Sequence, residues 1–235
     1  MADLVAAAGA AGVERIVSIG VGRAGSEQAI AAAEEHPGVW ATVGVHPHDA
    51  GEWNDADARW MVDLGAHPRV VGVGECGLDF FRNHASPAEQ RRAFGAQIGI
   101  ARDLGKPLVV HTRDAADETI AMLDAEASGV TVLLHCFSQV DHVAEVIERG
   151  WFTSIAGQIT FSKADDLRAA AAALPAERLL VETDSPYLTP APNRGKPNQP
   201  ANVVDTLHRL AEVRGMSAED CEALTDANAR QLFGW

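Results

Sequence analysis

The sequence predicts an α/β fold, a (β/α)8 barrel of the TIM type, in which residues 1–235 form a single domain. Three observations support this prediction. Short apolar segments typical of buried parallel strands alternate with segments typical of helices. Several apolar segments end in a histidine or a carboxylate, and the active sites of such barrels lie where the strands end. The length of 235 residues and the apolar content of 47% suffice for one domain with a sizeable core.

Seven segments have the composition of buried strands, starting near residues 16, 39, 70, 108, 131, 152 and 179. A closed barrel of this type has eight strands. Because a helical segment over 2–12 precedes the first predicted strand, we expect the first barrel strand to be missing from this chain at the N-terminus. An open doubly wound sheet could also hold seven strands, but the sequence lacks the Gly-x-Gly-x-x-Gly pattern of dinucleotide-binding folds.

Local signals place the other elements. Ser86-Pro87-Ala88-Glu89 forms a capping box with proline at the first helical position, and this helix is expected to end at Gly105. Two strands are expected over 39–47 and 151–160, the first of them ending near His46. Further helices are expected to start at Gly25 and to cover 55–66, 115–127, 140–149 and 163–173.

Four residues of types that commonly bind metal ions occur at the ends of four predicted strands, namely Glu75, His111, His135 and Asp184. In a parallel barrel these strand ends meet on one face, so the four side chains are expected to form a metal site. Histidine and carboxylate ligands suit divalent ions such as Mg²⁺, Mn²⁺ or Zn²⁺. Two such ions about 3.5–4 Å apart can stabilise the attacking and leaving oxygens of a phosphodiester. The residues alone also allow a carbonyl substrate, such as D-aminoacyl-tRNA or a lactone.

Several neighbouring residues have more than one interpretation. His46, Arg113, Arg194 and Asn198 are candidates for substrate contact. The two arginines are equally well explained as solvated loop residues, and Asn198 as the N-cap of a helix that starts at Pro200.

Two cysteines follow predicted ligands directly. Since successive side chains of a strand alternate between its faces, Cys76 and Cys136 are expected to point away from the site into the core. Asp79 is expected to support the loop or the ligands rather than to bind metal.

Composition limits the possible partners. A formal charge of −14 argues against holding nucleic acid by general electrostatic attraction, so a phosphodiester substrate would need metal ions and a few local basic groups. The three cysteines show no disulfide pattern and favour a reducing compartment. The start MADLVAAAGAAG has neither a targeting signal nor a membrane span, so we expect a cytoplasmic protein without a membrane partner.

Five ordered motifs resemble those of the TatD family of metal-dependent deoxyribonucleases. They are GVHPHD (44–49), GECGLDF (74–80), HTRDA (111–115), HCFS (135–138) and TDSPYLTP with NRGKPN (183–198). The resemblance covers nearly the whole chain and implies a two-metal hydrolase that cleaves DNA, with single-stranded ends as the expected exonuclease substrate. It implies that Glu75 bridges two metals, that His111 and His135 complete one metal site, and that Asp184 serves the other and orients the attacking water.

Members of that family begin with an apolar strand that ends in His-x-His, and this sequence has no such motif, since its first histidine is His36. We therefore expect one retained ion at the histidine half-site and weak binding at the other. The simplest explanation is a miscalled start, with about 20 residues upstream in frame. The complete family form is expected to be a monomer. A catalytically impaired, truncated barrel is the alternative.

Overall fold

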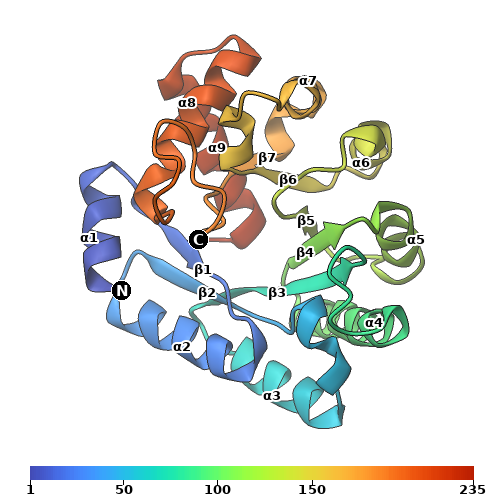
Figure 1. The fold of residues 1–235 in the computed structure, drawn as a ribbon. Helices are drawn as coiled ribbons and strands as arrows, with labels where there is room; N and C mark the ends of the chain where they lie inside the picture. The colour runs from blue at the N-terminus through green and yellow to red at the C-terminus, as the bar shows by residue number, and fades with distance from the viewer. The chain divides into compact units, whose positions relative to one another are not determined.

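A computed structural model describes residues 1–235 of the chain (Figure 1). It contains two compact units, one formed by Arg15–Leu134 and the other by Met1–Glu14 together with His135–Trp235. The strands begin at residues 16, 39, 70, 108, 132, 152 and 179, which confirms the seven predicted strands to within one residue. Their alternation with helices is that of the predicted TIM-type barrel, and helix α1 precedes the first strand.

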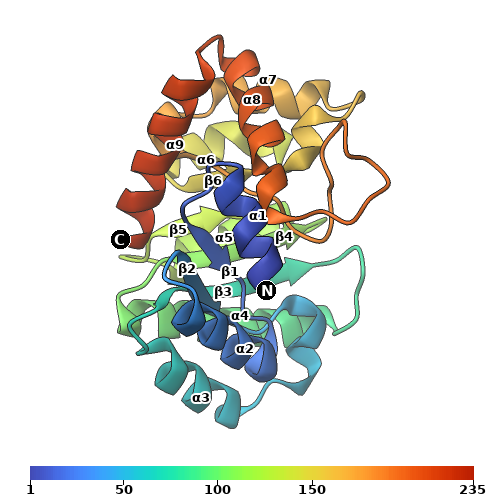
Figure 2. The same cartoon turned by 90° about the vertical axis from the view of Figure 1, so that its left-hand side faces the viewer.

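The unit Arg15–Leu134 holds five strands that pair in chain order, all parallel. Helices α2, α3 and α4 lie together on one side of these strands (Figures 1 and 2). Strand β3 is buried on both faces, with Glu75 its one partly exposed residue. The elements are β1 (Ile16–Ser18), α2 (Gly22–Glu35), β2 (Val39–Val43), η1 (Pro47–Glu52), α3 (Asp55–Gly65), β3 (Val70–Asp79), α4 (Pro87–Leu104), β4 (Leu108–Arg113), α5 (Ala116–Glu126) and β5 (Val132–Leu134).

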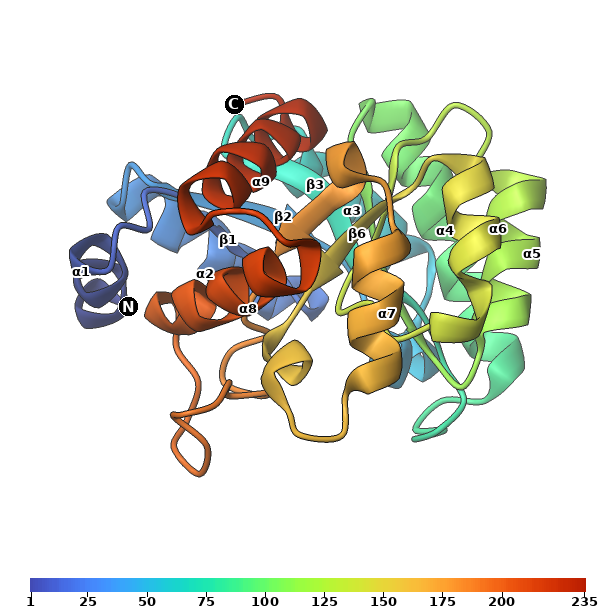
Figure 3. The same cartoon turned by 90° about the horizontal axis from the view of Figure 1, so that it is seen from above.

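The other unit contains a parallel pair of strands, β6 and β7. Helices α8 and α9 pack side by side (Figure 3), and α1 contacts η5, the turn that leads into α8. The elements are α1 (Ala2–Ala10), η2 (Val140–His142), α6 (Val143–Arg149), β6 (Phe152–Ile155), η3 (Gly157–Thr160), α7 (Asp165–Ala173), η4 (Ala176–Arg178), β7 (Leu179–Val181), η5 (Pro200–Asn202), α8 (Val203–Arg214) and α9 (Ala218–Phe233).

Helix α4 begins and ends as predicted. The Ser86 side chain accepts the N–H of Glu89, the Glu89 carboxylate accepts the N–H of Ser86, and Gly105 closes the helix in the left-handed conformation. Two buried glutamines on this helix hold the backbone where strands end. Gln97 forms two hydrogen bonds with Val45, just beyond β2, and Gln90 forms two with Asp79 at the end of β3. Helix α4 therefore positions the loops that follow both strands.

Three predicted boundaries are wrong. Strand β2 ends at Val43 rather than at residue 47, because the chain passes too close to β3 at the next position: a Cβ on Gly44 would lie 2.5 Å from the carbonyl carbon of Gly74. Strand β6 ends at Ile155, where a 3₁₀ turn replaces the predicted continuation to residue 160. Helix α2 starts at Gly22, not at Gly25, because the N–H of Gly22 bonds to the carbonyl of Gly44 and starts the turn earlier.

Candidate metal centre

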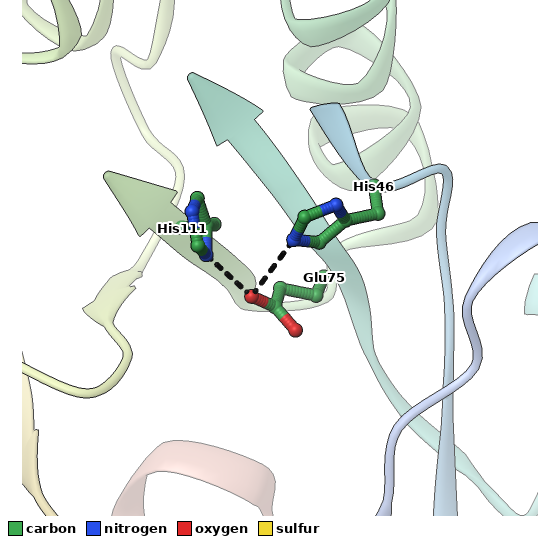
Figure 4. A group of neighbouring side chains, drawn as sticks. All are labelled: His46, Glu75 and His111. Carbon is green, nitrogen blue, oxygen red and sulfur yellow. Dashed lines mark hydrogen bonds and ion pairs between the residues drawn. The ribbon is translucent and has the colours of Figure 1, made fainter. Parts of the chain in front are cut away.

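Three side chains converge in the unit Arg15–Leu134 (Figure 4). Glu75 lies within β3, His111 within β4, and His46 three residues beyond the end of β2. The Glu75 carboxylate oxygen Oε1 lies 2.8 Å from Nδ1 of His111 and 3.6 Å from Nε2 of His46. One donor atom from each residue lies within 4.8 Å of the other two. Because all three are partly buried and belong to the residue types that bind divalent ions, this metal triad has the composition of a cation site.

Asp79 contacts His111 of the metal triad and helps to orient its ring. Its fully buried carboxylate lies 3.2 Å from Nε2 of His111 and 2.9 Å from Nε2 of His48, and accepts the backbone N–H groups of Phe81 and Arg82. Burial raises the pKa of Asp79, but the Arg82 N–H and the two imidazoles outweigh it and hold the pKa below its usual value. Asp79 is therefore an anion within hydrogen-bond distance of Nε2 of His111, while Nδ1 of the same ring lies within hydrogen-bond distance of Glu75. A carboxylate that contacts the far nitrogen of a histidine in this way is common where histidines bind metal ions.

A second group of ligand-type side chains occupies the other unit. His135, directly after β5, has its Nδ1 3.0 Å from Oε1 of Glu182, which directly follows β7. The second oxygen, Oε2, accepts the hydroxyl of Ser154 and the backbone N–H of Cys136. Oε1 of Glu182 is buried and accepts no hydrogen bond, because Nδ1 of His135, although 3.0 Å away, is hydrogen-bonded to Oε2 at 3.1 Å. A cation bound beside Oε1 would offset the cost of burying it.

Cys136 corrects one sequence-based expectation. Its Sγ lies within 4.8 Å of donor atoms of His135 and Glu182, although the strand alternation predicted that it points away. The alternation does not apply because β5 ends at Leu134 and Cys136 has a left-handed backbone with φ of 49°. Burial, followed by the Glu182 charge, raises the pKa of the Cys136 thiol to about 12, so the thiol is neutral near pH 7 and a weak ligand. Cys76, in contrast, is fully buried as predicted.

The structure brings together some predicted site residues and adds others. Glu75 and His111 lie together as predicted, and His46, predicted as a substrate contact, lies beside both. Glu182 was missed by sequence reasoning, which took Asp184 as the carboxylate of the LLVETD segment. The signal was available, since Glu182 is the first polar residue after the apolar run of β7. Asp184 lies half-buried two residues further along, with a left-handed backbone and a carbonyl that accepts the N–H of Tyr187.

Two of the remaining predicted substrate contacts are arginines, Arg113 at the last position of β4 and Arg194 in the loop between β7 and η5. Arg113 and Arg194 are exposed, each with its guanidinium about 4 Å from a phenylalanine ring, Phe81 for Arg113 and Phe161 for Arg194.

Asn198 is buried, and its side-chain amide donates to the carbonyls of Thr183 and Tyr187. The N-cap of η5 is Gln199, so Asn198 is not the cap of that turn. Its amide fastens the loop after β7.

Residues 1–234 match the family described as TatD related DNase. The chain belongs to this family. The 3′-5′ ssDNA/RNA exonuclease TatD of Klebsiella pneumoniae (strain 342) is 41% identical over 239 residues, covering 99% of this chain and 91% of that protein. The exonuclease of the same description from Escherichia coli K12 is 39% identical over 239 residues, covering 99% and 92%. As a family member, the protein is a metal-dependent hydrolase of phosphodiester bonds.

Solved structures confirm the predicted fold class. A TatD homologue from Escherichia coli K12 superposes with a TM-score of 0.92 at 25% identity, covering 100% of this chain and 92% of that one. A phosphotriesterase homology protein from Escherichia coli shares the fold, with a TM-score of 0.71 at 18% identity over 98% of this chain and 88% of that one. None of the helices is long and apolar enough to cross a membrane.

Proposed function

We propose that this TatD family member is a 3′-5′ exonuclease that removes nucleotides from single-stranded DNA or RNA. The observation that carries the proposal is the metal triad of His46, Glu75 and His111, which come from adjacent strands and the segment after β2 and are oriented by the buried Asp79. The polarity and the single-stranded substrate are those of relatives about 40% identical over almost the whole chain.

We infer sites for two divalent ions, Mg²⁺, Mn²⁺ or Zn²⁺, one formed by the metal triad and one by His135 with Glu182, and the expectation that only one ion is retained stays a prediction. When bound, such ions stabilise the charge that develops on the oxygens of a phosphodiester and lower the pKa of water. The protein's part is to hold the donor atoms in place. Asp79 holds the His111 ring in place through its contact with Nε2, and Ser154 and the Cys136 N–H orient the Glu182 carboxylate.

The remaining assignments rest on the sequence. Asp184 is proposed to accept a proton from the attacking water, and the role of Glu75 as a bridge between two ions stays a prediction. Arg113 and Arg194 are proposed to contact substrate phosphates, since both residues are exposed, Arg113 at the end of β4 and Arg194 in the loop after β7. The three free thiols support a reducing, cytoplasmic location. The match over residues 1–234 supports a single functional domain.

The test is digestion of a single-stranded oligonucleotide labelled at either end. A 3′-5′ exonuclease releases a 3′ label at once as a mononucleotide, whereas it shortens a 5′-labelled strand progressively. Excess chelator should abolish both reactions, and added Mg²⁺ or Mn²⁺ should restore them. Metal analysis of the purified protein gives the number of bound ions.

Variants connect the activity to the metal triad. Glu75→Gln should lose nearly all turnover and bind less metal while its thermal unfolding stays cooperative. A matched control is Glu34→Gln, because Glu34 also lies near a histidine, His67, at 3.3 Å, but on an exposed helix. Chelator-resistant activity, or faster cleavage of a D-aminoacyl-tRNA or a lactone than of single strands, would overturn the proposal. A chain without metal and without any hydrolysis would instead support the impaired barrel.

A further inference from the structure

Phe81 presents an exposed aromatic ring directly after β3. The residue is 55% exposed, so its ring contributes little to the hydrophobic core. The guanidinium carbon of Arg113, at the end of β4, lies 3.9 Å from the ring centroid, and that of Arg82 lies 5.9 Å from it. The Arg113 guanidinium therefore lies over the Phe81 ring, and both residues are exposed to solvent.

The Phe81–Arg113 pair is fixed relative to the metal triad. One oxygen of Asp79 accepts the Phe81 N–H at 3.0 Å, and the other lies 3.2 Å from Nε2 of His111. Arg113 follows His111 by two residues on the same strand, a rise of about 6.6 Å. The Phe80 N–H also donates to the Arg113 carbonyl at 2.9 Å, which ties the two strand ends together. The pair therefore lies just beyond the metal triad, in the direction in which the strands end.

The charges around the pair favour an anionic ligand. No carboxylate lies within ion-pair distance of the Arg113 or Arg82 guanidinium, whereas the nearby Arg91 is paired with Glu118. In a chain with a formal charge of −14, two unpaired guanidinium groups around one exposed ring form a local basic site. Aromatic rings that stack bases, together with arginines that meet phosphates, are the usual elements of single-strand recognition.

We propose that Phe81 and Arg113 form a binding site for one nucleotide of the single strand beside the metal triad. The base stacks on the ring face that Arg113 leaves open, and Arg113 donates hydrogen bonds to the adjoining phosphate. This inference rests on the proposed function and adds the residues that select single strands. A base inside a duplex has both faces covered by its neighbours and is not free to stack on Phe81.

The experiment measures binding of uncleavable phosphorothioate oligonucleotides to the metal-loaded protein by fluorescence anisotropy. One strand carries all its bases, and three others lack the base at the first, second or third nucleotide from the 3′ end. Phe81→Leu should weaken binding of the intact strand by about 5- to 150-fold, the range found for single base–aromatic contacts. The unsubstituted protein should bind one of the three abasic strands more weakly than the intact strand, by the same factor. The Phe81→Leu variant should bind that abasic strand and the intact strand with equal affinity.

Arg113→Met tests the phosphate contact, and it should reduce the slope of log affinity against log salt by about one. The matched control is Trp151→Leu, since Trp151 also lies against an arginine, Arg149 at 5.5 Å, but at the residue before β6, the opposite end of a strand. The control should bind like the unsubstituted protein, and all variants should keep the same metal content.

The outcomes separate this site from the proposed function. The stacking site is overturned, and the exonuclease function is not, if Phe81→Leu binds the intact strand as tightly as the unsubstituted protein does. The same holds if Phe81→Leu lowers the affinity for all three abasic strands by the same factor. If binding depends on Phe81 but no strand is cleaved, the exonuclease function fails and the site remains. If no single strand binds, the site is overturned.

Discussion

Replacing Gln97 by methionine should destabilise the loop that carries His46. Gln97 is buried, its Oε1 accepts the Val45 N–H at 2.8 Å, and its Nε2 donates to the Val45 carbonyl at 3.0 Å. Methionine has a similar length but neither donor nor acceptor, so the N–H and the C=O of Val45 would stay buried without partners. Each unsatisfied group costs about 1–3 kcal/mol. The free energy of unfolding should fall by roughly 2–6 kcal/mol, a large part of a typical domain's stability.

The assay is urea unfolding in the presence of chelator, so that metal binding does not contribute to the difference. Gln28→Met, on the exposed face of α2, is the matched control and should change the unfolding free energy by less than about 0.5 kcal/mol. Because His46 follows Val45, Gln97→Met should also weaken metal binding in a calorimetric titration. A loss of stability no larger than that of the control would refute the reasoning that Gln97 holds this loop.

Three further predictions concern a loop, a cap and a ligand. Asn198→Ala leaves the carbonyls of Thr183 and Tyr187 without their side-chain donor and should lower the thermal midpoint through a loss of roughly 1–3 kcal/mol; an unchanged midpoint would contradict the loop role. Ser86→Ala removes the N-cap of α4 and should cost about 1 kcal/mol in urea unfolding, with no change in metal content. Glu182→Gln should reduce bound metal in elemental analysis, and full retention would exclude Glu182 as a ligand.

The sequence by itself determined the order and type of most elements. Strands buried on both faces appear as continuous apolar runs, and the helix from Ser86 to Gly105 carries its own start and stop signals. Both kinds of signal depend on residues close together in the chain, so they can be recognised without the fold. The sequence also placed His135 directly after its strand, whereas Glu75 and His111, predicted at strand ends, lie within β3 and β4, which continue to Asp79 and Arg113.

Only the tertiary structure decided which of these side chains meet. His46 lies beside Glu75 because β2 ends at Val43, because the backbone of β3 leaves no room for a Cβ at Gly44, and because Gln97 holds Val45. Glu182, which sequence reasoning missed, groups with His135 and Cys136. Such outcomes depend on the backbone direction after a strand ends and on contacts between residues distant in the chain. Neither is encoded in a local apolar pattern, so the starts of the strands were predictable, while the ends of β2 and β6 and the partners of each ligand were not.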